Sequence, residues 1–242
     1  KDSIKTEEIL EELENEKDKD KVTNEPELTE NYYFEGKLDG EPFLIEKKYY
    51  KEYSDQQPFR LDYGGTVINC SNKPEKDIHT NCYTVYACGI HVDRFAYPEE
   101  YGTHNTAKMY FGKINVDKRI FNNELTELKN FLKNDKLTFR RDFGTIEKQG
   151  TFAFDFFPPS THNFNQIAYS SRYNDNSEHT AKITSVEEID TYFFVIEGTV
   201  ENCKLYDSRE YTSVNPSYKV LTDFKFRVKI KGDFNYNIYK DE

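Results

Sequence analysis

The 242-residue chain is long enough for one all-β domain or two small ones, and 36% of its residues are apolar against 32% charged. Phe and Tyr each occur 19 times whereas Trp is absent, so bulky aromatic side chains must supply much of the core. The net charge of −11 disfavours DNA or RNA as the main partner, and no apolar run has the length of a membrane-spanning helix.

The acidic charge is concentrated at the N-terminus. Residues 1–30 contain five lysines and twelve acidic residues, a net of −7 that leaves −4 for the rest of the chain. Such a segment has too few large apolar residues to offset the entropy lost on ordering. We therefore expect residues 1–31 to form an acidic flexible tether and residues 32–242 to form a single β-rich globular domain.

The globular part opens with a hairpin pattern. Asp39-Gly40 lies between two strand-like stretches, and this dipeptide supplies the positive φ angles of a two-residue turn. Further short strands, bounded mostly by Asn, Asp, Gly or Pro, are expected at residues 66–69, 82–92, 108–111, 137–140, 150–157, 166–171 and 179–184. This spacing favours a mainly β fold, an antiparallel β-sandwich or an open barrel with one short helix, over alternating βαβ units.

The helix is expected just after residue 122. Its apolar residues Leu125, Leu128, Phe131 and Leu132 fall on one face, with Asn122 or Asn123 as the N-terminal cap. We expect this helix to cover an end of the sheet.

The two strongest strand patterns lie near the C-terminus. In residues 221–231 the apolar side chains Phe224, Phe226, Val228 and Ile230 alternate with Lys or Arg, which is the period of a strand with one buried face. Residues 192–200 are apolar on both faces as far as Glu197, as expected for a covered strand. We predict that these two strands are antiparallel neighbours. We also predict that the Lys/Arg face is a solvated surface and not a nucleic-acid site, because stacking with bases requires exposed aromatic rings and the aromatic rings here point away from the charges.

The four cysteines, Cys70, Cys82, Cys88 and Cys203, permit three pairings. In a secreted chain we favour one or two disulfides, with Cys70–Cys82 as the first candidate because it closes a polar loop. Cys82 and Cys88 are too far apart for a direct bond in a straight strand, at roughly 20 Å. Four buried thiols are the alternative.

Motifs for catalysis and for cofactor binding are absent from the sequence. No phosphate-binding loop, dinucleotide fingerprint or nucleophile elbow occurs, and no two histidines have the spacing of a local metal site. The sequence thus predicts a non-catalytic protein without cofactor or metal. Two Tyr-rich stretches flanked by charge suit exposed contact loops, and their candidate binding residues are Tyr49, Tyr50, Tyr53, Tyr97 and Tyr101.

Three stretches resemble small surface lipoproteins of unknown function from Bacteroidota. They are the opening hairpin at residues 34–43, the segment 181–200 with its Gly-Thr step, and the final strand at residues 220–230, in which Phe224 follows Asp223 without the usual Gly. The resemblance implies a lipidated cysteine just before Lys1, an acidic export signal and a lipid anchor in the outer membrane. It implies no catalytic residues.

The function we expect is that of a surface lipoprotein that serves as an accessory or binding subunit of an outer-membrane complex, such as a transporter or secretion channel. The cell surface is the expected location, with the periplasmic face as the alternative. A carbohydrate- or peptide-binding module that uses the Tyr-rich loops is the second hypothesis, and a hydrolase whose carboxylates are gathered by the fold is the third.

Overall fold

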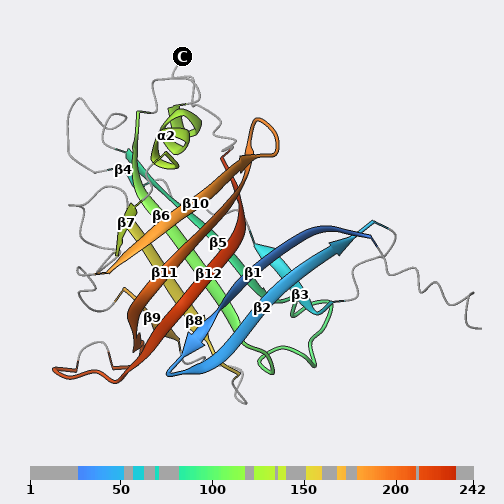
Figure 1. Cartoon of the computed structure of the whole chain (residues 1–242), viewed down its shortest axis with the longest axis vertical. Coiled ribbons are helices and arrows are strands. Elements are labelled where there is room, and N and C mark those ends of the chain that lie inside the picture. Colours follow the sequence, from blue (N-terminus) through green and yellow to red (C-terminus); the bar gives the residue numbers. More distant parts are fainter. Residues whose placement is uncertain are drawn as a thin grey trace, which may run out of the picture.

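A computed structural model describes residues 27–51, 57–62, 69–70, 82–117, 123–133, 136–139, 151–159, 168–172, 179–210 and 213–232. These residues form a mainly β structure with one helix, as the sequence predicts (Figure 1). The elements are β1 (Leu28–Leu38), β2 (Glu41–Tyr50), β3 (Phe59–Asp62), β4 (Asn69–Cys70), β5 (Cys82–Val92), β6 (Thr106–Val116), α2 (Asn123–Phe131), β7 (Lys136–Phe139), β8 (Thr151–Phe157), β9 (Tyr169–Ser170), β10 (Thr180–Glu188), β11 (Phe193–Asp207) and β12 (Tyr218–Lys231).

The predicted Asp39-Gly40 hairpin joins β1 to β2. Asp39 and Gly40 have φ angles of 53° and 85°, and Leu38 is paired with Glu41 directly beside the turn. Asp39 also fixes the neighbouring strand, because its Oδ1 accepts a hydrogen bond from the Val220 N–H at 2.7 Å. β1 begins at Leu28, so residues 28–31 belong to the sheet and not to the predicted tether, and residues 1–26 lie outside the described residues.

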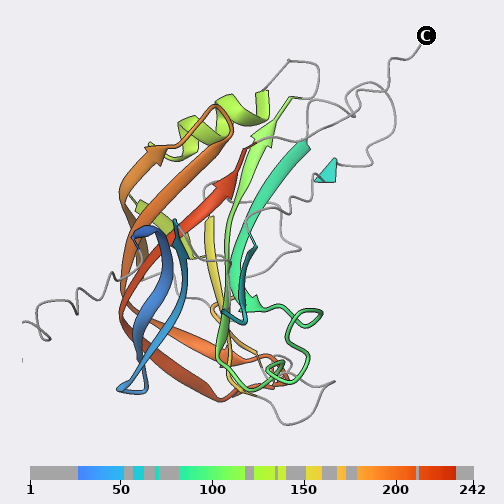
Figure 2. The same cartoon turned by 90° about the vertical axis from the view of Figure 1, so that its right-hand side faces the viewer.

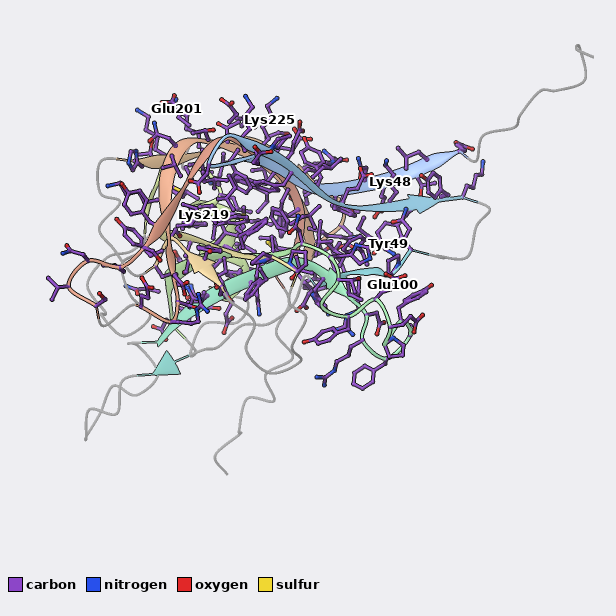
Figure 3. The ribbon with its side chains drawn as sticks, turned by 90° about the horizontal axis from the view of Figure 1, so that it is seen from below. Lys48, Tyr49, Glu100, Glu201, Lys219 and Lys225 are labelled. Carbon is purple, nitrogen blue, oxygen red and sulfur yellow. The ribbon has the colours of Figure 1, made fainter. Side chains whose placement is uncertain are left out.

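The predicted pairing of the two C-terminal strands is confirmed, since β11 and β12 run antiparallel over almost their full length. The predicted apolar face of β12 is also buried, and its four side chains, Phe224, Phe226, Val228 and Ile230, are at most 1% exposed. Lys225 on the opposite face is exposed and points outward, on the same side of the molecule as Glu201 of β11 (Figure 3). The core is therefore on one side of this sheet and charged side chains are on the other.

The strands form one twelve-stranded sheet that curls into a nearly closed barrel. Its order is β2-β1-β12-β11-β10-β7-β8-β6-β5-β3, with β4 beside β5 and with β9 joined to both β11 and β8. All neighbours are antiparallel except β7 and β8, which are parallel. Figure 2 shows the green strands facing the orange and red ones across the interior. The two ends of the sheet, β2 and β3, leave a seam.

Helix α2 lies over one end of the barrel, as predicted (Figure 2). Leu128, Phe131 and Leu132 are buried in the core, and Leu128 approaches Gly232 so closely that a Cβ there would lie 2.9 Å from its Cδ2. Asn123 joins the helix to the end of β6, because its Oδ1 accepts a hydrogen bond from the Asp117 N–H at 2.6 Å. The helix thus contributes to the core and carries no cluster of candidate functional groups.

Candidate binding surface

The structure places the predicted tyrosines in two neighbouring regions. Tyr49 and Tyr50 are at the end of β2, whereas Tyr97 and Tyr101 lie in the loop 93–105 between β5 and β6. Tyr53 lies outside the described residues. Figure 3 shows Tyr49 of β2 on the same side of the molecule as Glu100 of the loop 93–105. The sheet therefore brings both Tyr-rich stretches to one side of the barrel, close to the seam.

None of these four tyrosines is fully exposed. The Tyr49 ring packs edge-on against Tyr32, with the ring centroids 6.1 Å apart. Lys47 contacts the same ring, since its Nζ lies 5.4 Å from the centroid and the residue is only 1% exposed. Tyr49 thus serves packing between β1 and β2, and its ring is no free stacking platform for a sugar.

Loop 93–105 is ordered by its first residue. Asp93 Oδ1 accepts hydrogen bonds from the N–H groups of Phe95 (3.0 Å) and Ala96 (3.3 Å), and Asp93 O accepts one from the Tyr97 N–H at 2.8 Å. The two backbone donors stabilise the carboxylate, so they lower the pKa of Asp93 below its ordinary value of 3.8. The loop conformation gains this contribution above that ordinary pKa and loses it as the pH falls through the lowered one.

A second group of contacts fixes the end of the loop. Glu100 accepts a hydrogen bond from the Thr103 hydroxyl at its carbonyl oxygen (2.8 Å) and pairs through Oε2 with His104 Nε2, also at 2.8 Å. The His104 ring packs against Phe59 of β3, with the centroids 5.3 Å apart. The loop is thereby held against the strand that borders the seam.

The exposed aromatic residue in this loop is Phe95, which the sequence analysis did not single out. Its side chain is 78% exposed, and the Arg94 guanidinium lies over its ring at 4.7 Å from the centroid. The Asp93 turn holds the Phe95 backbone through its N–H group. The site that the structure presents is therefore an Arg-aromatic pair on an ordered loop, flanked by half-buried tyrosines.

Residues 57 and 58 connect this loop to β2. Gln57 Oε1 accepts a hydrogen bond from the Lys48 N–H at 3.1 Å, and Pro58 O accepts one from the Asp93 N–H at 2.8 Å. Lys48 in turn pairs with Glu46 at 2.7 Å. These contacts place the edge of β2, the short strand β3 and the loop 93–105 in one surface, which we call the seam surface.

A buried polar cluster lies elsewhere, where β8 meets β9. Asp155 is 1% exposed, pairs with the Arg172 guanidinium and accepts a hydrogen bond from the Ser170 hydroxyl at 2.6 Å. The guanidinium also lies 5.0 Å from the centroid of the Tyr110 ring. Burial, followed by the charge of Asp155, raises the pKa of Tyr110 above its ordinary value. These groups are hydrogen-bond and ion-pair partners of one another, so we interpret the cluster as a structural one that stabilises the contact between β8 and β9.

Two of the four cysteines are free in the structure. Cys88 on β5 and Cys203 on β11 are buried thiols, and burial raises the pKa of both, that of Cys203 to about 12. Cys70 and Cys82 face each other in the β4–β5 ladder, a register compatible with a cross-strand disulfide. The positions of their sulfur atoms lie outside the described part of the chain, so this bond stays a prediction.

The thiols give a direct check of these assignments. In the native protein at mildly alkaline pH, Cys88 and Cys203 are expected not to react with a water-soluble thiol reagent, because the thiolate is the nucleophile. After unfolding in denaturant without reductant, two thiols should react if Cys70 and Cys82 are bonded and four if they are not. Rapid modification of Cys88 or Cys203 in the folded protein would contradict the buried placement.

Across the described residues, no three His, Cys, Asp or Glu side chains come together in a group that could hold a metal ion, and no helix there is long and apolar enough to cross a membrane. Comparisons with protein-family models, with curated proteins and with solved structures find no match for this chain. The resemblance to small surface lipoproteins is thus still a prediction from the sequence.

Proposed function

We propose that this protein is a non-catalytic binding protein that contacts a protein partner through its seam surface. The main observation in support is the exposure of Phe95, a large apolar side chain that is 78% exposed on a loop whose backbone is fixed by hydrogen bonds. A pre-ordered aromatic loses little entropy on binding, and aromatic residues and Arg are enriched where interfaces carry most of their energy.

We propose further that the partner is an outer-membrane assembly, such as a transporter or secretion channel, and that a lipid anchor before Lys1 holds the protein at the membrane. The acidic stretch of residues 1–30 and the resemblance to surface lipoproteins support this setting. Metabolic labelling of native cells with a fatty-acid analogue tests the anchor. Absence of label from the purified protein would remove the anchor from the proposal and leave the binding surface standing.

Replacing Phe95 with alanine is expected to abolish most partner binding. A central aromatic anchor typically contributes about 2 kcal/mol or more, so the affinity should fall by roughly 30-fold. The partner is first recovered by co-purification of the tagged full chain in mild detergent, and its affinity for wild type and Phe95→Ala is then measured by surface plasmon resonance.

Val214→Ala is the matched control. Val214 is 95% exposed but lies on the hairpin between β11 and β12, outside the seam surface, so its removal should leave the affinity unchanged. Two results would count against the proposal: recovery of the tagged protein without any partner, or an affinity that Phe95→Ala and Val214→Ala leave equally intact.

A further inference from the structure

Strand β2 has an open edge. It comprises ten residues, stands at one end of the sheet order, and among the described residues pairs only with β1 (Figure 1). An unpaired edge presents a row of backbone N–H and C=O groups that another strand can join. β2 is therefore a candidate for recognition through the main chain.

The direction of its backbone groups follows from one hydrogen bond. The Lys48 N–H points away from β1, because it donates to Gln57 Oε1 at 3.1 Å. Backbone groups of alternate strand residues point to the same side, so those of Glu46 and Leu44 also face the open edge, together with the carbonyl of Pro42. In this arrangement the Gln57 amide occupies the position that a strand carbonyl would take.

The edge is protected at its ends and open in its middle. Pro42 has no N–H to offer, and the Glu46–Lys48 ion pair places charge at the far end, both common protections of an edge strand. Leu44 between them is 55% exposed. An exposed leucine beside unpaired backbone groups does not protect the edge. An incoming strand would gain most at this point, because it would form backbone hydrogen bonds and bury the Leu44 side chain.

The strand on the other side of the seam has a matching direction. Successive strands from β2 round to β3 are antiparallel except for the parallel pair of β7 and β8. β2 and β3 consequently run in the same direction. A strand that is antiparallel to β2 therefore also runs antiparallel to β3.

The side chains that border the seam define what this segment must carry. Phe43, Ile45 and Leu61 are buried on the inner side, whereas Arg60 of β3 is exposed on the outer side. A complementary segment alternates apolar residues toward the barrel with polar ones toward solvent, and a carboxylate is the complement of Arg60. Phe95 lies on the loop that adjoins this seam.

We propose that the partner bound at the seam surface supplies an extended segment of alternating apolar and polar residues, with an acidic residue opposite Arg60, and that this segment adds to β2 as an antiparallel strand. This inference rests on the proposed function and names the form of the partner's contact. The incoming main chain bonds to Leu44 and Glu46, and one of its carbonyls takes the Lys48 N–H from Gln57.

Random-sequence peptides displayed on phage, long enough to span β2, are the probe. They are selected on the full-length protein and then measured against Leu44→Pro and Leu44→Ala. Leu44→Pro removes an N–H that faces the edge, whereas Leu44→Ala removes the same side chain and keeps that N–H. The N–H makes no bond to β1, so both variants should melt close to wild type.

Selected peptides are expected to alternate apolar and polar residues and to carry an acidic position. Their affinity for Leu44→Pro should be at least about tenfold lower than their affinity for Leu44→Ala. They should also protect the Leu44 and Glu46 amides of the wild-type protein from hydrogen exchange. The exchange measurement stands without either variant. Failure to select any peptide, equal binding to both variants, or pairing of β2 between two copies of the protein in place of a peptide would overturn strand addition. Loss of partner binding in Phe95→Ala but not in Leu44→Pro would leave the binding function intact and reject only this mode.

Discussion

Phe224→Ala is expected to destabilise the protein by about 3–5 kcal/mol, the typical cost of removing a buried phenylalanine ring. Phe224 is 0% exposed, and its ring lies 4.5 Å from that of Phe154 and 6.2 Å from that of Phe34, between centroids. It therefore joins β12 to β8 across the interior and to β1 beside it. No described aromatic neighbour can fill the space without breaking its own contacts.

Chemical denaturation measures this loss, and calorimetry should show a melting temperature lower by roughly 10 °C. Phe95→Ala is the matched control, because it removes the same ring from a side chain that is 78% exposed and should change the stability by less than about 0.5 kcal/mol. Equal stabilities for the two variants would mean that Phe224 is not part of a close-packed core.

The elements that the sequence predicts well are those with strong local patterns. The alternation around Phe224 predicts the buried face of β12, Asp39-Gly40 predicts the first hairpin, and the apolar face around Leu128 predicts the helix. Each depends on residues close together in the chain, where the period of two or 3.6 is directly visible. The β strand at residues 82–92 matches its expected bounds for the same reason.

The closure of the sheet depends on contacts that no local pattern contains. The parallel pairing of β7 with β8 and the junction of β9 with both β8 and β11 bring together residues far apart in the chain. Periodicity assigns side chains to faces but does not order the strands, so a sandwich and a barrel are equally compatible with it. Strand β3, only four residues long, has too short a pattern to be recognised.

The sequence places Tyr97 and Tyr101 in a loop, but it does not indicate which ring of that loop is exposed. Both tyrosines are half-buried, and the exposed ring is that of Phe95, two residues before Tyr97. Exposure within a loop is set by its internal hydrogen bonds, here those of Asp93, and not by residue type. In the sequence, Phe95 simply follows Asp93 and Arg94 after the end of β5. Its exposure follows only once the turn made by Asp93 is known.

Asp155→Ala is expected to cost about 3–5 kcal/mol, nearly as much as the loss of a core ring. Asp155 alternates with Phe154 and Phe156 along β8, yet it is only 1% exposed, and its carboxylate binds Ser170 of the paired strand β9 and Arg172. Its removal leaves the Arg172 guanidinium, whose side chain is only 18% exposed, without the carboxylate that offsets its desolvation. β9 also loses the hydrogen bond from the Ser170 hydroxyl, and it should then separate from β8.

Asp207→Ala separates this effect from the simple loss of a buried acid. Asp207 is 2% exposed, but its partner Arg209 has a side chain 58% exposed and can be hydrated when the acid is removed, so the expected loss is only about 1 kcal/mol. Replacing Asp155 with Ala and Arg172 with Met together should recover part of the stability, because no unpaired charge is then buried. If denaturation instead shows additive losses in this double variant, the two residues act independently and β9 is held by its backbone pairing alone.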